Sequence, residues 1–192
     1  MALIYLYRHG EQSNETGLLP SNIPISEIAI GKVNEWAELC PFAPDIIIVS
    51  SYLSSKQSGR PFINKGLCDR IQIWRVHPFL NISPKKLQKA DKQQSHQLMT
   101  CYWEKLDPEY KDGKDAESFI DLIERVRECI TLIAEQKDKK IVMISHESFL
   151  NAIRWLIKNK DTAINGKSMM DYYQFNQSHP IAYLKGFTLS IG

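Results

Sequence analysis

Two apolar stretches that lie far apart in the chain each end at a histidine. Residues 3–7 form an apolar, aromatic run that is typical of a buried strand, and the run stops at Arg8 and His9. Residues 140–145 form a second run of this kind, and His146 follows it. Ligands of open α/β sheets bind at the carboxyl ends of the strands. Two such strands can therefore place both imidazoles at one edge of one sheet.

Strand-like and helical patterns alternate along the rest of the chain. Strand-like runs also cover residues 45–50 and 71–76, and helical patterns cover residues 26–41, 51–64, 95–106, 118–136 and 149–158. This alternation predicts an α/β fold of three layers, with a mostly parallel sheet and helices on both faces. Residues 172–175 and 181–189 are strand-like too. We expect the last of them to form an antiparallel edge strand.

The length of the chain predicts one domain over residues 1–192, because 192 residues suffice for a sizeable core. The stretch from residue 78 is polar and irregular, and we expect an insertion or lid over about 78–115. Its polar, irregular first part, from residue 78 to about residue 94, contains four lysines, namely Lys85, Lys86, Lys89 and Lys92. They form either a solvated face or a source of positive charge for an anionic substrate.

Charge and composition exclude several classes of partner. The net charge is +2, from 24 basic and 22 acidic residues, which does not suggest binding to nucleic acid or to a membrane surface. No apolar run approaches the length of a membrane span, and we expect no signal peptide at the amino terminus. The four cysteines are widely spaced, which predicts buried thiols in a reducing compartment, with the cytoplasm as the default.

The residues that follow the two strands suit phosphoryl transfer. A neutral imidazole such as that of His9 can attack phosphorus and form a phosphohistidine. The phosphoryl oxygens then need cations and N–H donors, which Arg8 and a protonated His146 can supply. Gly10 lets the backbone turn and come close to a ligand.

Arg8-His9-Gly10-Glu11 and Ser145-His146 together resemble the histidine phosphatase superfamily, which has the phosphoglycerate-mutase-like fold. Further matches to a bacterial branch of that superfamily, in the expected order, are residues 73–77, 102–104, 107–110, 116–119 and 125. The resemblance covers nearly the whole chain. It implies the fold described above and a phosphate site that needs no cofactor and no metal. The implied phosphate-binding residues are Arg8, His9, Gly10, Asn14 and His146.

The chain departs from the family where a second arginine is expected. The family places this arginine on the helix after the second strand, and the matching position is Ser54. Lys56 and Arg60 are close in sequence, but their helical phases differ from that of residue 54 by about 200° and 240°. Neither side chain is therefore expected to point the same way.

A second departure concerns the general acid. The family has a glutamate shortly after the third strand, and the matching position is Pro78, which can transfer no proton. The candidate substitutes are Glu147, where the family usually has glycine, and His77. We expect Glu11 and Glu117 to support the site structurally.

Two further positions differ from the family: Glu15 replaces an asparagine that the family tends to have, and Asn151 replaces an arginine.

These residues predict a phosphomonoesterase that acts on a small phosphorylated substrate, with His9 as the nucleophile and Arg8, His146 and Glu147 as further catalytic residues. The alternative is a degenerate member that binds phosphate or a phosphorylated ligand without catalysis, which Ser54 and Pro78 favour. A phosphoglycerate mutase is disfavoured, because the chain is short for that branch and lacks the acid. A metal site on the two histidines is also disfavoured, since the sequence offers no obvious third ligand.

Overall fold

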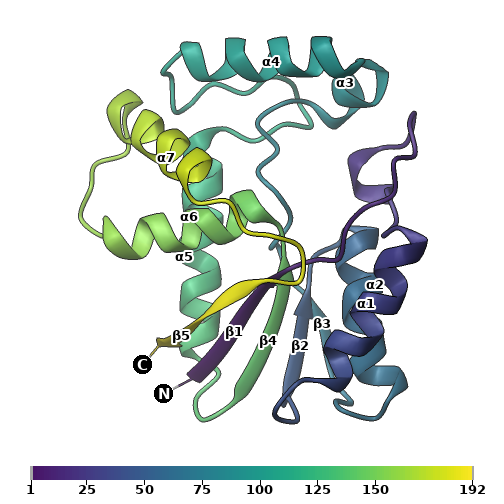
Figure 1. Ribbon diagram of the computed structural model, residues 1–192. Helices are drawn as coiled ribbons and strands as arrows, with labels where there is room; N and C mark the ends of the chain where they lie inside the picture. The colour runs from purple at the N-terminus through teal and green to yellow at the C-terminus, as the bar shows by residue number, and fades with distance from the viewer. Residues whose placement is uncertain (1, 192) are drawn as a thin grey trace.

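The computed structural model describes residues 2–191 and contains a five-stranded sheet in the order β3-β2-β4-β1-β5 (Figure 1). The strands are β1 (Ala2–Arg8), β2 (Ile46–Val49), β3 (Ile71–Ile73), β4 (Lys140–Ser145) and β5 (Gly186–Ile191). Strands β1, β4, β2 and β3 pair in parallel, and β5 pairs antiparallel to β1. The predicted mostly parallel sheet with an antiparallel edge strand is confirmed.

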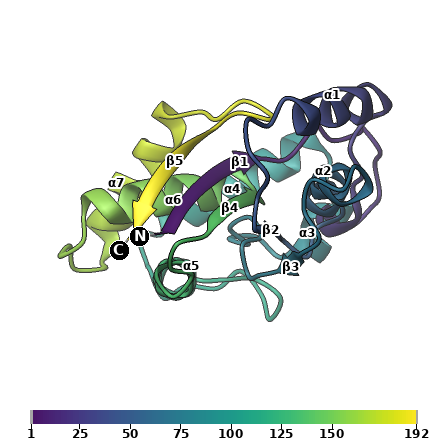
Figure 2. The same cartoon turned by 90° about the horizontal axis from the view of Figure 1, so that it is seen from below.

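The helices cover both faces of this sheet (Figures 1 and 2). Along β1, Ile4 and Leu6 pack into a core with α5 and α6, whereas Tyr5 and Tyr7 pack on the other face with residues of α1 and α2. This alternation follows from the period of two along a strand, and it gives the predicted three layers. The helices are η1 (Pro20–Asn22), α1 (Glu27–Glu38), α2 (Leu53–Asn64), α3 (Pro84–Lys89), α4 (Lys92–Glu104), α5 (Phe119–Ala134), α6 (Glu147–Lys158) and α7 (Gly166–Ser178).

The register of the sheet sets the position of the two histidines. Arg8 is paired with Ser145 at the carboxyl ends of β1 and β4. His9 and His146 therefore follow their strands at the same edge, and His146 is also the N-cap of α6. Helices α3 and α4 lie beyond this edge of the sheet (Figure 1).

The expected strand at residues 172–175 is wrong, because these residues lie within α7. Asn165 caps this helix, and its side chain accepts a hydrogen bond from the Ser168 N–H. Met169 and Tyr172 are three residues apart and both buried, so the segment follows helical periodicity. Its aromatic content, which is typical of strands, serves here to pack α7 against its neighbours.

The polar stretch after residue 78 is more regular than expected, since it contains α3 and the start of α4. Asp91 caps α4 with a capping box that it forms with Gln94. The strand expected over residues 71–76 ends at Ile73, and both of its terminal isoleucines are exposed at the edge of the sheet.

Three single residues also differ from expectation. Ile28 and Leu39 of the predicted α1 stripe are exposed, and Cys101 is exposed rather than buried.

Among residues 2–191, no helix has both the length and the apolar character that crossing a membrane requires.

Candidate active site

The imidazoles of His9 and His146 lie side by side at the carboxyl edge of the sheet. Their ring centroids are 4.7 Å apart, and the two residues are only 4% and 5% exposed. The side chains line one cavity of about 280 Å³, and Arg8 and Glu147 line it as well. The predicted convergence of the two strand-terminal histidines and Arg8 is therefore confirmed.

A hydrogen bond to a backbone carbonyl determines which nitrogen of the His9 ring carries the proton. Nδ1 lies 2.7 Å from the carbonyl oxygen of Gly10, and a carbonyl can only accept, so Nδ1 carries the proton. Burial is the main cause that lowers the pKa of His9 to about 4. The ring is thus neutral near pH 7, and Nε2 keeps the lone pair that a nucleophile requires.

His146 is held between a serine and a tyrosine. Its Nε2 lies 2.8 Å from Oγ of Ser50, and its ring makes an edge contact with Tyr52 at a centroid distance of 4.9 Å. Burial, followed by the neighbouring His9, lowers the pKa of His146 well below its usual value. The expected protonated state is thus opposed by the protein itself, and a bound phosphoryl dianion would favour it.

Arg8 is held by a carboxylate at the rim of the cavity. Its Nη1 lies 2.7 Å from Oε2 of Glu147 and donates a hydrogen bond of 2.6 Å to the carbonyl oxygen of Ile181. The other carboxylate oxygen of Glu147 accepts from the Ile181 N–H, and the guanidinium lies over the ring of Tyr183. The Nε of Arg8 is buried and has no hydrogen-bond partner among the described residues. An anionic ligand would therefore compete with Glu147 for this arginine.

Gly10 is needed for packing at the start of the loop after β1. A Cβ atom at this position would lie 2.8 Å from Cγ2 of Val33. Its N–H donates to Oγ of Ser58 at 2.9 Å, and Gly10 does not line the cavity. Asn14 is exposed and also lies outside the lining. The structure thus brings four of the six candidate residues to the cavity and leaves these two beside it.

The position of the absent second arginine is filled by a small polar network. Ser54 is fully buried, and its Oγ accepts a hydrogen bond of 3.3 Å from Nε2 of Gln12, which lines the cavity. Lys56 and Arg60 are exposed on α2, as their helical phase predicted, and neither lines the cavity. Gln12 therefore occupies the space between Ser54 and the cavity.

The loop that carries Pro78 is fixed by a buried ion pair. Arg125 is 1% exposed, pairs with Glu117 at 2.8 Å, and donates to the carbonyl oxygens of Arg75 and His77. Glu117 also accepts from the Leu80 N–H, which agrees with the structural role expected for it.

His77 belongs to this loop and not to the cavity lining. Its Nδ1 lies 3.0 Å from the carbonyl oxygen of Pro78, and its Nε2 lies 3.9 Å from Glu117. Pro78 itself does line the cavity. Of the two candidate substitutes for the acid, only Glu147 therefore borders the site.

Sequence reasoning assigned no ligand role to several residues that line the cavity, among them Gln12, Tyr52, Ser148 and Asn176. Tyr52 and Ser148 lie just after strand ends, a position that marks them as candidates. Asn176 reaches the cavity from α7, and nothing in the sequence indicates that.

Two other features bear on the location of the site. Among the residues that the structure describes, no group of three or more histidine, cysteine or acidic side chains could hold a metal ion.

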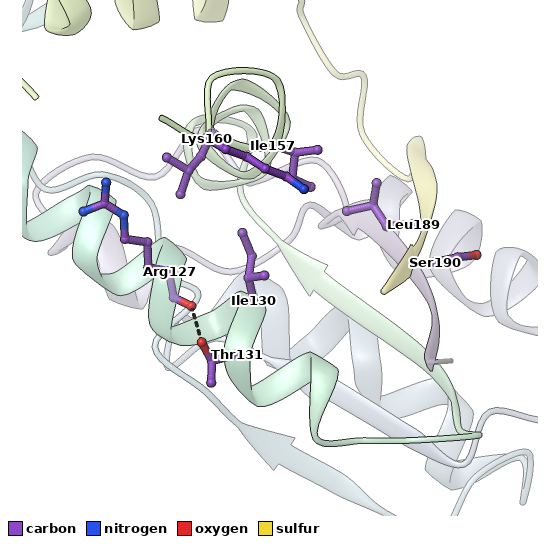
Figure 3. A pocket seen from close by; sticks show the side chains of 8 residues that line it. Arg127, Ile130, Thr131, Ile157, Lys160, Leu189 and Ser190 are labelled. Carbon is purple, nitrogen blue, oxygen red and sulfur yellow. Dashed lines mark hydrogen bonds between the residues drawn. The ribbon is translucent and has the colours of Figure 1, made fainter. Parts of the chain in front are cut away.

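A separate cavity of about 440 Å³ lies between α5, α6 and β5 and contains none of the candidate residues (Figure 3). The candidate catalytic residues therefore lie at the carboxyl ends of the strands and not in this second cavity.

Comparisons with known structures support the fold. The chain resembles the structure of a mycobacterial glucosyl-3-phosphoglycerate phosphatase with a TM-score of 0.67 and 13% identity, covering 97% of this chain and 88% of that one. It also resembles a phosphoserine phosphatase from Entamoeba histolytica in complex with 3-phosphoglyceric acid, with a TM-score of 0.62 and 14% identity, covering 98% and 90%. At these identities the likeness shows the fold alone.

The comparison with curated protein sequences found no match. The model of the family described as the histidine phosphatase superfamily (branch 1) matches residues 4–176. This match spans both strand-terminal histidines, and the chain belongs to the histidine phosphatase superfamily.

Proposed function

We propose that the protein is a phosphomonoesterase that acts through a phosphohistidine on His9. The observation that carries the proposal is the state of the His9 ring, which is buried, neutral and bonded through Nδ1 to the carbonyl oxygen of Gly10. Nε2 is then the nitrogen left to attack phosphorus. Membership of the histidine phosphatase superfamily supports phosphatase chemistry at this site.

The reaction runs in two steps. Nε2 of His9 attacks phosphorus, the bond from phosphorus to the ester oxygen breaks, and the electron pair leaves with that oxygen. Arg8 and His146 stabilise the charge on the equatorial phosphoryl oxygens. Water then attacks the phosphohistidine, the N–P bond breaks, and inorganic phosphate leaves with the enzyme restored.

Glu147 is the proposed substitute for the missing acid, since it borders the cavity and His77 does not. Both of its oxygens accept hydrogen bonds, from Arg8 and from the Ile181 N–H. To protonate a leaving oxygen, Glu147 would have to take up a proton and release Arg8. A phosphate that draws Arg8 toward itself would favour that change.

The alternative function is binding of a phosphorylated ligand without turnover. The Arg8–Glu147 ion pair favours it, because the pair places a negative charge beside the proposed phosphate position. Ser54 and Pro78 favour it as well, because they replace a phosphate-binding arginine and the acid.

The remaining proposals follow from the same site. The ligand is a small phosphorylated molecule or phosphate, and the segment 78–115 serves as a lid within a single domain. We place the protein in the cytoplasm because its four cysteines are all unpaired.

An activated aryl phosphate tests the function directly. The native protein should release the phenol with or without chelator, and the reaction should leave an acid-labile phosphohistidine that mass spectrometry detects on His9. His9→Ala should lose both signals, whereas His179→Ala, which changes a histidine outside the cavity lining, should keep them. Phosphate binding with no turnover and no phosphoenzyme would overturn catalysis and leave the binding function.

A further inference from the structure

A larger cavity continues from the candidate active site toward the lid. Its volume is about 610 Å³, and its lining includes residues of α3, α4 and α7. Five residues line both cavities, namely Pro20, Tyr52, Pro78, Ser148 and Asn176. Because the two spaces share these walls, the leaving group of a phosphate ester bound at His9 would extend into the larger one.

The walls of this lid cavity contain none of the four strongly charged residue types, and His96 is the one histidine among the described residues that line it. No lysine, arginine, aspartate or glutamate is among its described lining residues. The lid lysines are exposed and lie elsewhere, and Lys86, for example, pairs with Asp112. Of the two roles considered for these lysines, the solvated face is therefore confirmed. A leaving group with a carboxylate or a second phosphate would lose hydration here and gain no lysine or arginine partner among the described lining residues.

Aromatic and apolar side chains form much of the wall. Phe79, Trp103 and Tyr172 line the cavity and are at most 8% exposed. Trp103 stacks on Tyr173 at a centroid distance of 4.7 Å, and Met99 faces the same space. Such walls favour a flat ring system, which gains both apolar burial and edge contacts with the aromatic side chains.

One buried amide can bind a polar substituent. Asn81 is 5% exposed and lines the cavity, and its Nδ2 donates to Sδ of Met99 at 3.2 Å. A thioether is a weak acceptor, so a hydroxyl or carbonyl oxygen on a ligand would be a better partner for Asn81.

Pro78 lines both cavities and therefore lies at their junction. Proline gives no proton, and Glu147 can give one only after it releases Arg8, so a leaving group at this place departs most readily when it is stable as an anion. A phenolate satisfies this condition, and an alkoxide does not. The residue at the junction and the aromatic walls of the lid cavity thus both favour an aryl leaving group.

We infer that the preferred substrates are phosphate monoesters of uncharged aromatic alcohols with more than one ring, with the phosphoryl group at His9 and the rings in the lid cavity. The inference rests on the proposed phosphatase function. In the step itself, the bond from phosphorus to the aryl oxygen breaks as the bond to Nε2 of His9 forms. The electron pair leaves as phenolate, which takes its proton from water.

Binding without turnover gives the first test. In His9→Ala, calorimetry should show 1-naphthyl phosphate binding at least about tenfold more tightly than inorganic phosphate, because the naphthyl group buries apolar surface. 3-Phosphoglycerate and phosphoserine should bind no better than phosphate. If naphthyl phosphate gains nothing over phosphate, the inference is overturned while phosphate binding stands. If neither this variant nor the native protein binds any of these anions, both the inference and the proposed function fail.

Matched variants on α4 give the second test. Met99→Lys puts a charge in the wall of the cavity and should reduce kcat/KM on 1-naphthyl phosphate about tenfold or more relative to that on phenyl phosphate. Gln97→Lys adds the same charge to the same helix outside this cavity and should change neither value, and Met99→Leu should keep the preference. A native enzyme that turns over phenyl phosphate but prefers 3-phosphoglycerate to 1-naphthyl phosphate would overturn the inference and leave the phosphatase intact.

Discussion

Nη1 of Arg8 lies 2.7 Å from Oε2 of Glu147, so the arginine proposed to bind phosphate is already paired with a carboxylate. Both side chains are partly exposed, at 21% and 29%. Glu147 follows His146 at the first position of α6, where the family usually has glycine. The pair therefore couples the two histidine-bearing segments and places a negative charge where an anion should bind.

Removing the charge of Glu147 should strengthen anion binding. In Glu147→Gln, Arg8 no longer has a charged competitor, and we expect phosphate to bind about tenfold more tightly, in line with the value of a charge-assisted hydrogen bond. Calorimetry with inorganic phosphate measures this change. Glu38→Gln on α1 removes an equal charge at an exposed site and should leave phosphate affinity unaltered.

The same variant separates two roles of Glu147. A loss of about 10²-fold or more on alkyl phosphates, with aryl phosphates spared, would identify Glu147 as the general acid. If the variant changes the rate by the same factor on alkyl and on aryl phosphates, Glu147 acts only as the partner of Arg8. Unchanged phosphate affinity would contradict the competition that the ion pair implies.

An arginine at position 54 should restore the missing phosphate contact. Ser54 is separated from the cavity by Gln12, so the informative variant combines Ser54→Arg with Gln12→Ala. We expect phosphate affinity to rise roughly 10- to 150-fold, which corresponds to about 1.5–3 kcal/mol. Lys56→Arg is the matched control, because it adds an arginine to the exposed face of the same helix. A folded double variant with native affinity would show that the site cannot use a second arginine.

The buried histidines should make stability depend on pH. Burial lowers the folded-state pKa of His9 to about 4, whereas an unfolded histidine titrates near its ordinary value of 6.5. Between these values the unfolded chain binds more protons, so the free energy of unfolding should fall as pH falls from about 6.5 toward 4. The slope is at most about 1.4 kcal/mol per pH unit for each such histidine. His146, whose pKa burial also lowers well below its ordinary value, should add a second contribution.

Urea unfolding at pH 4.5, 5.5, 6.5 and 7.5 measures this dependence. His9→Asn should reduce the slope, because it removes one of the three histidines whose pKa burial lowers, the others being His77 and His146. His96→Asn, at an exposed position on α4, should not reduce it. If the free energy of unfolding has the same slope against pH in the native protein and in His9→Asn, then His9 does not contribute to the pH dependence of stability.

The Arg125–Glu117 pair should dominate the stability of the loop at Pro78. Arg125→Gln removes the buried guanidinium and leaves the Glu117 carboxylate, which is 12% exposed, without its arginine, and we expect it to lower the free energy of unfolding by about 3–5 kcal/mol. The exposed pair of Arg75 with Glu128 provides the comparison. Arg75→Gln should cost at most about 1 kcal/mol. Similar urea midpoints for the two variants would contradict the structural role of the buried pair.

The sequence contained enough information for the sheet and for the core of the site. Buried strands can be recognised as apolar runs of strand length, because burial on both faces excludes polar residues from them. Once β1 and β4 pair in parallel, their carboxyl ends place His9 and His146 at the same end of the sheet. The existence of helices with good caps, such as α5, was also predictable; the sequence offered Asp115 or Ser118 as its start, and the structure has Ser118 as the N-cap.

Tertiary contacts decided the rest. Residues 172–175 have the composition of a strand, yet they are helical because Asn165 caps the segment and Tyr172 packs into the core. The pairing of Arg8 with Glu147 joins residues from two strand ends, and no local pattern predicts it. The lid cavity depends on side chains from α3, α4 and α7, which come together only when the chain folds. Sequence patterns thus determined most of the strands and helices and the residues at the carboxyl ends of the strands, because both depend on local periodicity. The partners of each functional side chain were decided by packing between segments that are distant in the sequence.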